Sequence, residues 1–242
     1  MFLSYIAIMI LPILLSGGMV LRIRPAENVL KLLLSFSAAY ILSLSFIHLL
    51  PEVFSGSKDS SAGLWVMAGF FIQLLLEFLS GGIEHGHIHI HEEDKRLPLA
   101  ILLGLFLHTF LEGLPLSGFI SGNLNHWDIS FLTGITLHNI PVSIALCSML
   151  LAQNISKKKL FLCLLLFSLM TPFGAFFGYL VEGGATTDGT FRRIILSLVI
   201  GIFLHIGTTI LFEGSEKNHH YRLGKLISIL LGAAAAWGLS QV

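Results

Sequence analysis

The chain has 242 residues, of which 55% are hydrophobic and only 12% are charged, and its formal net charge is zero. Soluble domains carry about 25% charged residues, so a chain with half that share is expected to have lipid as its main solvent. The balanced charge gives no sign of a nucleic-acid partner, and two cysteines are too few for a disulfide framework. We therefore expect an integral membrane protein.

Eight apolar stretches divide the chain. A helix needs roughly 20 apolar residues to cross a hydrocarbon core about 30 Å thick. The stretches that meet this length cover about 2–21, 31–50, 63–82, 98–120, 129–152, 159–181, 193–213 and 223–241. The predicted fold class is therefore an all-α membrane protein, a bundle of eight transmembrane helices. No polar stretch is long enough for a further soluble domain, so residues 1–242 are expected to form one transmembrane domain.

The basic residues between the spans predict the orientation, because cytoplasmic loops carry an excess of lysine and arginine. With the N-terminus outside, eleven of the fourteen basic residues fall on the cytoplasmic side and three fall outside. The eleven are Arg22, Arg24, Lys31, Lys95, Arg96, Lys157, Lys158, Lys159, Lys217, Arg222 and Lys225, and the three are Lys58, Arg192 and Arg193. Both termini are thus expected to be extracytoplasmic.

Polar residues first interrupt the apolar pattern near the end of the second span, in FIHLLPE, which contains His48 and Glu52. They fit either a solvated helix end or a metal-entry point at the outer mouth. After the third span, a cytoplasmic loop of about 83–97 carries alternating histidines, namely His85, His87, His89 and His91. A flexible segment of this kind can bind divalent ions loosely. Metal capture or sensing therefore competes with a merely polar loop.

The fourth and fifth spans carry the deepest ionisable side chains. His108 and Glu112 are four residues apart, so they lie on one helical face, and His138 lies near the same depth in the next span. Such groups cost several kcal/mol in a bilayer and usually face a partner or a pathway. Imidazole with carboxylate suits zinc and other first-row divalent ions, whereas calcium and magnesium prefer all-oxygen shells. The three side chains are predicted to hold one cation and to leave one coordination position open.

A further histidine, His205, lies inside the seventh span. A single histidine between helices is more often a hydrogen-bonding packing residue than a ligand. The alternative is that His205 lines the cytoplasmic part of an ion pathway.

Several motifs together resemble the ZIP family of divalent-metal transporters across nearly the whole chain. They are FIHLLPE in the second span, GFFIQLLLEF before the histidine-rich loop, HTFLEGLPLSG and HNIPVSIAL in the fourth and fifth spans, TPFGAFFG in the sixth, and GIFLHIGTTILFEGSE in the seventh. The resemblance implies a metal site between the fourth and fifth helices, often with two adjoining ion positions. It also implies transport toward the cytoplasm.

The chain departs from the usual forms of the two metal-binding motifs, His-Asn-x-x-Glu-Gly and His-Asn-x-Pro-Glu-Gly. Thr109 replaces the first asparagine, and Val142 and Ser143 replace the second Glu-Gly pair. Thr171 precedes Pro172 where many members have glutamate. Without these carboxylates a second dication is not expected.

The predicted site therefore holds a single ion on His108, Glu112, His138 and Asn139, with Thr109 and Ser143 as auxiliary groups. On the pathway, His48 and Glu52 are expected near the outer mouth. His205 and the loop histidines are expected on the inner route.

The predicted function is transport of a divalent metal ion, with Zn²⁺ as the first candidate and Fe²⁺, Mn²⁺ or Cd²⁺ as alternatives. The chain is not expected to be an enzyme, and it lacks the phosphate-binding G-x-x-x-x-G-K-[ST] motif. The rivals are an intramembrane zinc-dependent hydrolase and a ZIP-like metal sensor that does not transport. The expected location is the cell membrane, which is the inner membrane in a bacterium. A homodimer is compatible with the sequence, which does not set the oligomeric state.

Overall fold

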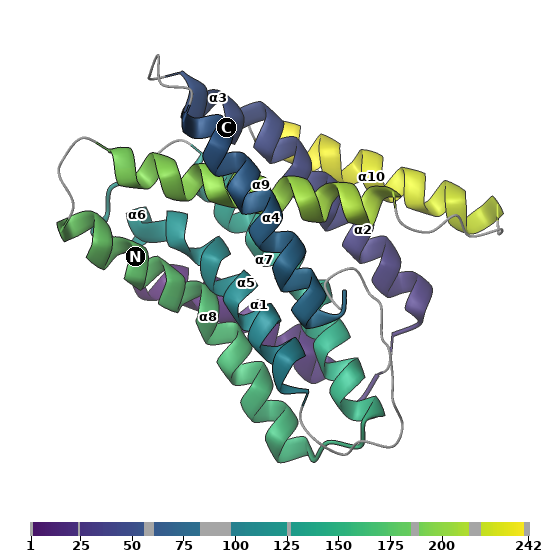
Figure 1. Ribbon diagram of the computed structural model, residues 1–242. Helices are drawn as coiled ribbons and strands as arrows, with labels where there is room; N and C mark the ends of the chain where they lie inside the picture. The colour runs from purple at the N-terminus through teal and green to yellow at the C-terminus, as the bar shows by residue number, and fades with distance from the viewer. Residues whose placement is uncertain are drawn as a thin grey trace.

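The computed structural model describes residues 2–23, 25–55, 61–82, 98–124, 127–184, 189–212 and 219–239. All regular elements in these ranges are helical, which confirms the predicted class (Figure 1). Seven helical rods are long and apolar enough to cross a membrane, and the N-terminal helix α1 (Phe2–Met19) is a shorter apolar one. Together they match the eight predicted spans. The histidine-rich loop of 83–97, with His85, His87, His89 and His91, lies outside the described residues.

The rods are built from α-helices, two of them with short irregular turns. The elements are α2 (Glu27–Leu44), the π-turn η1 (Ser45–Leu49), α3 (Leu50–Phe54), α4 (Ser61–Ser80), α5 (Leu99–Gly113), the 3₁₀-turn η3 (Leu114–Ser117), α6 (Gly118–Ser121), α7 (Asp128–Ala152), α8 (Lys157–Gly184), α9 (Thr190–Phe212) and α10 (His219–Leu239). Helices α2 and α3 join through η1 into one rod, and α5 and α6 join through η3 into another.

The second rod is longer than predicted, because it continues past Pro51 and also begins before residue 31. Proline lacks an N–H, and its ring presses on the carbonyl four residues earlier, which usually ends a helix. Here the backbone widens just before the proline, and the Leu50 N–H donates to the Ser45 carbonyl, five residues back. The resulting π-turn carries His48. Turns of this kind are frequent at functional sites.

Pro115 tightens the fourth rod instead. Proline has no N–H to donate to the Leu111 carbonyl, and the structure shows that the Leu114 N–H donates to this carbonyl instead. The helix closes into a 3₁₀-turn over Leu114–Ser117 directly after Gly113. This backbone carbonyl is therefore already engaged beside the buried histidine of α5.

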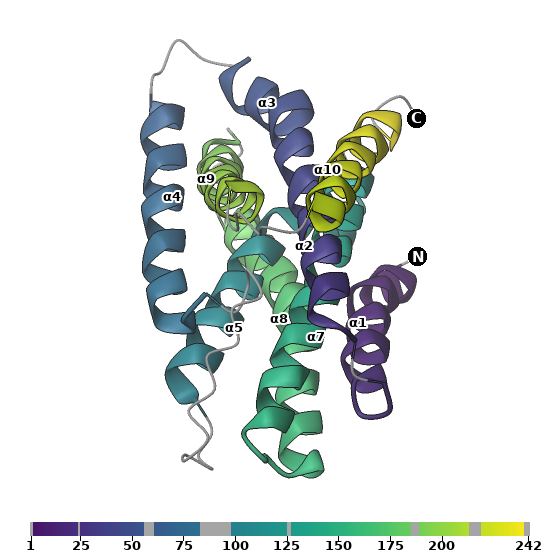
Figure 2. The same cartoon turned by 90° about the vertical axis from the view of Figure 1, so that its right-hand side faces the viewer.

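The rods pack into two sets. The most extensive contacts join α5 with α8 and α1 with α7, and separately α4 with α9 and α2 with α10. We call the first set (α1, α5, α7, α8) the α5 group and the second set (α2, α4, α9, α10) the α2 group. Figure 2 shows α10 beside α2 and α4 beside α9. The groups meet chiefly where α2 contacts α7 and where α4 contacts α5.

Glycines bring the backbones close within each group. A Cβ at Gly113 or Gly174 would clash with backbone atoms across the α5–α8 contact, and a Cβ at Gly69 or Gly201 would do so across the α4–α9 contact. Between the groups the approach is looser, since a Cβ at Gly104 would lie 2.9 Å from the nearest backbone oxygen of α4. Small residues allow this close helix packing in a bilayer.

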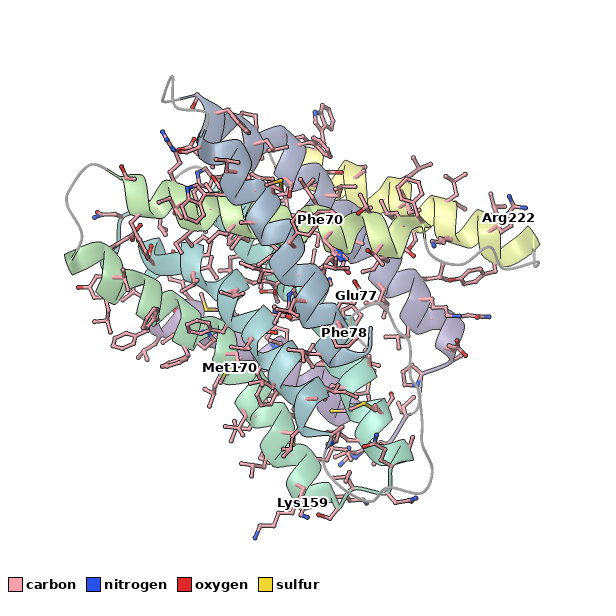
Figure 3. The ribbon with its side chains drawn as sticks, viewed as in Figure 1. Phe70, Glu77, Phe78, Lys159, Met170 and Arg222 are labelled. Atoms are coloured by element: carbon pink, nitrogen blue, oxygen red, sulfur yellow. The ribbon has the colours of Figure 1, made fainter. Side chains whose placement is uncertain are left out.

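The outer surface of the bundle is apolar. Leu3, Phe78 and Phe212 are 78%, 83% and 86% exposed. Charged Lys159 and Arg222 lie near the starts of α8 and α10, at the margins of the bundle (Figure 3). Apolar side chains outside and polar ones inside are the pattern of a multi-pass membrane protein.

Candidate metal centre

Helix α5 presents a histidine and a glutamate to the interior of the bundle. His108 and Glu112 lie one helical turn apart, and the His108 Nε2 atom is 3.2 Å from the Glu112 Oε1 atom. Both side chains have no exposed surface. Residues four apart share a helical face, so the local fold alone places this pair together.

Helix α7 adds the third side chain of the predicted site. The His138 ring lies almost perpendicular to that of His108, with 6.0 Å between the ring centroids. One ligand atom from each of His108, Glu112 and His138 lies within 4.8 Å of the others, and all three residues are buried. Zinc ligands about 2.0–2.2 Å from the ion lie at most about 4.4 Å apart, and about 3.3–3.6 Å apart in tetrahedral geometry. Binding would draw the three side chains slightly closer.

Each imidazole also contacts a polar side chain from the other helix group. The His108 Nδ1 atom lies 3.0 Å from the Gln73 Oε1 atom of α4, and the His138 Nδ1 atom lies 3.4 Å from the Ser37 Oγ atom of α2. Gln73 and Ser37 have no exposed surface. Neither residue was predicted as part of the site, although a glutamine inside the apolar run GFFIQLLLEF is itself a sign of a buried polar contact.

These contacts set the chemistry between His108 and Glu112. A carbonyl oxygen can only accept, so the contact with Gln73 requires the proton of His108 to be on Nδ1. The Nε2 atom of a neutral His108 then turns its lone pair toward a carboxylate oxygen 3.2 Å away. Two acceptors at that distance require a proton or a metal cation between them. The arrangement is therefore suited to a bound cation.

Asn139 and the predicted auxiliary residues occupy different positions around this cluster. The Asn139 side chain reaches the Glu112 carboxylate, and its Oδ1 atom is buried with no hydrogen-bond partner among the described residues. The Thr109 hydroxyl donates to the Leu105 carbonyl at 3.0 Å. The Ser143 hydroxyl donates to the Ile140 carbonyl and also contacts Ser16 of α1. Of these three residues, Asn139 is the one whose buried acceptor atom has no partner in the described part of the chain.

The positions that depart from the usual motifs are buried beside the site but carry no charge. Val142 lies one turn after His138 on α7 and has no exposed surface. The Thr171 hydroxyl on α8 is buried and has no hydrogen-bond partner within the described ranges. Neither side chain supplies a carboxylate for a second dication.

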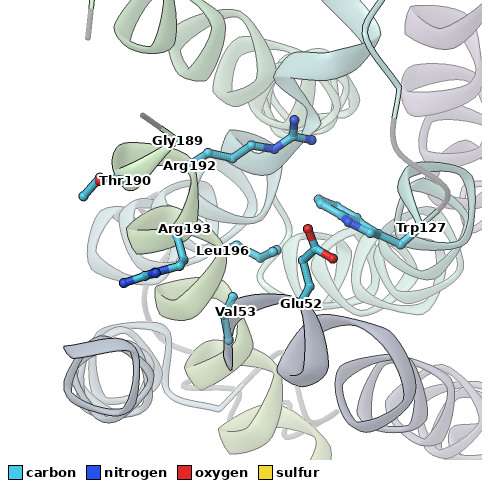
Figure 4. Close-up of a pocket in the computed structure, with 8 residues that line it drawn as sticks. All are labelled: Glu52, Val53, Trp127, Gly189, Thr190, Arg192, Arg193 and Leu196. Carbon is cyan, nitrogen blue, oxygen red and sulfur yellow. The ribbon is translucent and has the colours of Figure 1, made fainter. Parts of the chain in front are cut away.

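His48 and Glu52 lie apart from the cluster, near the end of the second rod. Glu52 is exposed and lines a cavity of about 310 Å³ together with Trp127, Thr190, Arg192 and Arg193 (Figure 4). The Arg192 guanidinium lies 5.3 Å from the centre of the Trp127 ring. Two arginines in one cavity disfavour a dication there unless carboxylates offset them.

Arg192 also approaches two carboxylates at this end of the bundle. Its Nη2 atom is 3.6 Å from the Asp128 Oδ1 atom, and its Nε atom is 3.9 Å from the Glu182 Oε1 atom. Asp128 has no exposed surface, whereas the Arg192 side chain is 28% exposed. The sequence analysis treated Arg192 only as a topology signal and did not select Asp128.

His205 of α9 forms a second histidine–glutamate pair. Its Nε2 atom is 3.0 Å from the Glu77 Oε2 atom of α4, and its ring stacks on Phe70 with 4.8 Å between centroids. The His205 side chain is 6% exposed and that of Glu77 is 25% exposed. Within the described ranges this pair has no third histidine, cysteine or carboxylate positioned to share an ion. The structure thus does not bring His205 into the central cluster.

Comparisons with known proteins agree with this architecture. A family model described as ZIP Zinc transporter matches residues 1–100 and 84–240. The zinc transporter ZupT of Chlorobium phaeovibrioides is 30% identical in an alignment of 220 positions that covers 82% of this chain and 82% of that protein. Protein zntD of Dictyostelium discoideum is 31% identical in an alignment of 168 positions that covers 64% of this chain. The zinc transporter ZIP13 of Bos taurus is 37% identical over 83 residues.

Matched lengths differ among these relatives. The matched regions make up only 24% of zntD and 20% of ZIP13, in contrast to most of ZupT. The fold and the buried cluster define a multi-pass membrane protein with a candidate metal centre between its helices. The chain belongs to the ZIP zinc transporter family. This family consists of transporters, which confirms the prediction that the chain is not an enzyme. Membership also argues against the alternative of an intramembrane zinc-dependent hydrolase.

Proposed function

We propose that this chain carries Zn²⁺ across a membrane toward the cytoplasm through one ion site made by His108, Glu112 and His138. The observation that carries this proposal is the convergence of two imidazoles and one carboxylate inside an otherwise apolar bundle. The relatives ZupT and ZIP13 are named as zinc transporters, which supports zinc as the ion. Fe²⁺, Mn²⁺ and Cd²⁺ accept the same donor types and are the alternatives.

The proposed coordination has three protein ligands and leaves room for Asn139 or a water. A site of this kind binds an ion and can also release it, whereas structural zinc sites are closed by four protein ligands. The ion and Glu112 bring opposite charges into a low-dielectric interior, which strengthens their attraction. Because Val142 and Thr171 are uncharged, we propose one ion per chain.

The proposed route runs from the end of the second rod, near His48 and Glu52, through the central site and past His205. The histidines of the 83–97 loop would receive or sense the ion on the cytoplasmic side. The orientation behind this direction rests on the distribution of lysine and arginine and on the family resemblance. Residence in the cell membrane, one domain over residues 1–242 and a homodimer remain predictions.

The test is uptake of ⁶⁵Zn into proteoliposomes that contain the purified chain. We expect saturable uptake by the parent and a loss of at least tenfold in Glu112→Ala and in His138→Ala, because each variant removes a ligand. Leu107→Ala is the matched control, since this side chain lies beside His108 on α5 and is 40% exposed. It is expected to keep uptake within twofold of the parent.

A folded, inserted parent that takes up none of the four ions would contradict transport and favour the metal sensor. Uptake that persists in both site variants would instead contradict the location of the site. The four ions are compared by competition, with each unlabelled ion added to the ⁶⁵Zn assay. Zinc as the main cargo predicts that unlabelled Zn²⁺ competes at the lowest concentration.

A further inference from the structure

The residues of the proposed ion site and the residues that contact them come from different helix groups. His108, Glu112 and His138 all lie on α5 and α7, in the α5 group. Gln73 lies on α4 and Ser37 on α2, in the α2 group. The α4–α5 and α2–α7 contacts that bring them together are also the main contacts between the groups. The site is therefore completed across this boundary.

Gln73 is an unusual residue for its helix. Most of α4 faces outward with apolar side chains, among them Phe71, Leu75 and Phe78, which are 57%, 60% and 83% exposed. Gln73 has no exposed surface, and its Oε1 atom accepts a hydrogen bond from the His108 Nδ1 atom at 3.0 Å. A buried amide without a suitable partner is costly in a bilayer, so this contact accounts for a polar residue at this position.

The same logic holds for His138 through Ser37. The Ser37 hydroxyl donates its only proton to the Leu34 carbonyl at 3.1 Å. Its oxygen is therefore left to accept from the His138 Nδ1 atom, 3.4 Å away. Both imidazoles then carry their proton on Nδ1 and keep the Nε2 lone pair for an ion. The longer distance makes the Ser37 contact the weaker of the two.

We propose that Gln73, with Ser37 in a weaker parallel role, is a positioning residue for the ion site. Each fixes the tautomer and the ring orientation of one ligand histidine, so that both Nε2 lone pairs are left for the ion. This inference rests on the proposed function, because it assumes that the cluster binds the transported ion. Groups that hydrogen-bond the distal nitrogen of a metal-binding histidine commonly change metal affinity by 10–100-fold.

A consequence is that ion affinity depends on how the two helix groups are docked. The backbones approach most closely within each group, at Gly113 and Gly174 in one and at Gly69 and Gly201 in the other. A shift between the groups would therefore lengthen the Gln73 and Ser37 contacts before it disturbed either group internally. Loss of both contacts would release the two imidazoles from their fixed orientation and weaken ion binding.

The test is Zn²⁺ affinity of the purified full chain in lipid nanodiscs, measured by competition with a fluorescent chelator. Gln73→Leu keeps the approximate shape and removes the acceptor, so we expect affinity to fall about 10–100-fold. Gln73→Glu keeps an oxygen in place and is expected to bind within threefold of the parent. Ser37→Ala should lose about three- to tenfold, in line with its longer contact. Phe71→Leu, on the lipid-facing side of α4, is the control.

Rescue by glutamate separates positioning from packing. A Gln73→Leu variant that binds within threefold of the parent would overturn the inference, as would equally weak binding by Gln73→Leu and Gln73→Glu. In ⁶⁵Zn uptake, the inference predicts that Gln73→Leu raises KM more than it lowers the maximal rate. Gln73→Met, with a flexible side chain of similar length, replaces Gln73→Leu if that variant does not fold.

Glu112→Gln in the same binding assay distinguishes failure of the proposed ion site from failure of the proposed role of Gln73. Parent-like zinc binding by Glu112→Gln would contradict the proposed site itself. Loss of binding in Glu112→Gln together with parent-like binding in Gln73→Leu would contradict only the role of Gln73.

Discussion

Glu112 and Asp128 are two carboxylates with no exposed surface in one bundle, yet their surroundings differ in kind. Asp128 lies 3.6 Å from the guanidinium of Arg192, a permanent cation that the protein itself provides. Glu112 faces imidazole nitrogens, which are neutral unless they bind a proton. The comparison teaches that burial alone does not identify an ion site. A buried carboxylate that meets no fixed positive charge requires a proton or a bound cation.

The His205–Glu77 pair lies between these two cases. It has the same residue types as the central cluster and a shorter contact of 3.0 Å. It is partly exposed and lacks a third ligand of this kind among the described residues. The number of convergent ligands therefore distinguishes the central cluster better than any one distance does.

The largest expected effect comes from neutralising Glu112, and neutralising Asp128 is its control. Glu112→Gln should weaken Zn²⁺ binding at least 100-fold, or about 2.7 kcal/mol, because it removes the anionic ligand. Asp128→Asn should change zinc affinity less than threefold, because that carboxylate is matched by Arg192. Isothermal titration of both variants with Zn²⁺ in detergent measures the two affinities. Equal losses of Zn²⁺ affinity in the two variants would contradict the proposed difference between Glu112 and Asp128.

The second expected effect is on the free energy of unfolding, and it concerns the ion pair of Asp128 with Arg192. Arg192→Gln leaves Asp128 buried without its guanidinium, and breaking a buried ion pair costs about 3–5 kcal/mol when both groups are fully buried. Because Arg192 is 28% exposed, we expect a smaller loss of about 2 kcal/mol, or a fall of about 4–8 °C in Tm. Thermal unfolding in detergent checks this value. Lys159→Gln, an exposed change on α8, is the control.

The smallest expected effect adds a charge to the central site. Val142 lies one turn after His138, as Glu112 lies one turn after His108. Val142→Glu should raise dication affinity about tenfold, or about 1.4 kcal/mol, and increase the zinc bound per chain from one to two. Val142→Gln has nearly the same size without the charge and should leave the stoichiometry at one. Zinc analysis of dialysed protein separates the outcomes. A stoichiometry of one in Val142→Glu would show that a second carboxylate alone does not create a second position.

Much of the fold follows from properties that are local in the sequence. Each apolar stretch of about 20 residues became a helix, and the four-residue spacing of His108 and Glu112 was enough to place them on one face. His138 was matched to them by its depth in the next span. The boundaries of the second rod were less accurate: the span was predicted as about 31–50, whereas the rod covers Glu27–Phe54 and accommodates Pro51 with a π-turn.

Contacts across helices were not predictable in the same way. Gln73 and Ser37 reach the imidazoles only because α4 and α2 are rotated to face α5 and α7, and rotation is set by packing over the whole bundle. The approach of Arg192 to Asp128 likewise joins α9 to the start of α7. A polar residue inside an apolar span was the available signal, but the sequence does not name its partner.

We propose that a single ion is held by the imidazoles of His108 and His138 and by the carboxylate of Glu112. The most direct measurement is X-ray absorption spectroscopy at the zinc edge on the zinc-loaded chain, paired with zinc analysis. We expect one zinc per chain with two imidazole ligands and one or two oxygens, and the loss of one imidazole in His138→Ala. A zinc bound without histidine, or an unchanged spectrum in His138→Ala, would contradict it.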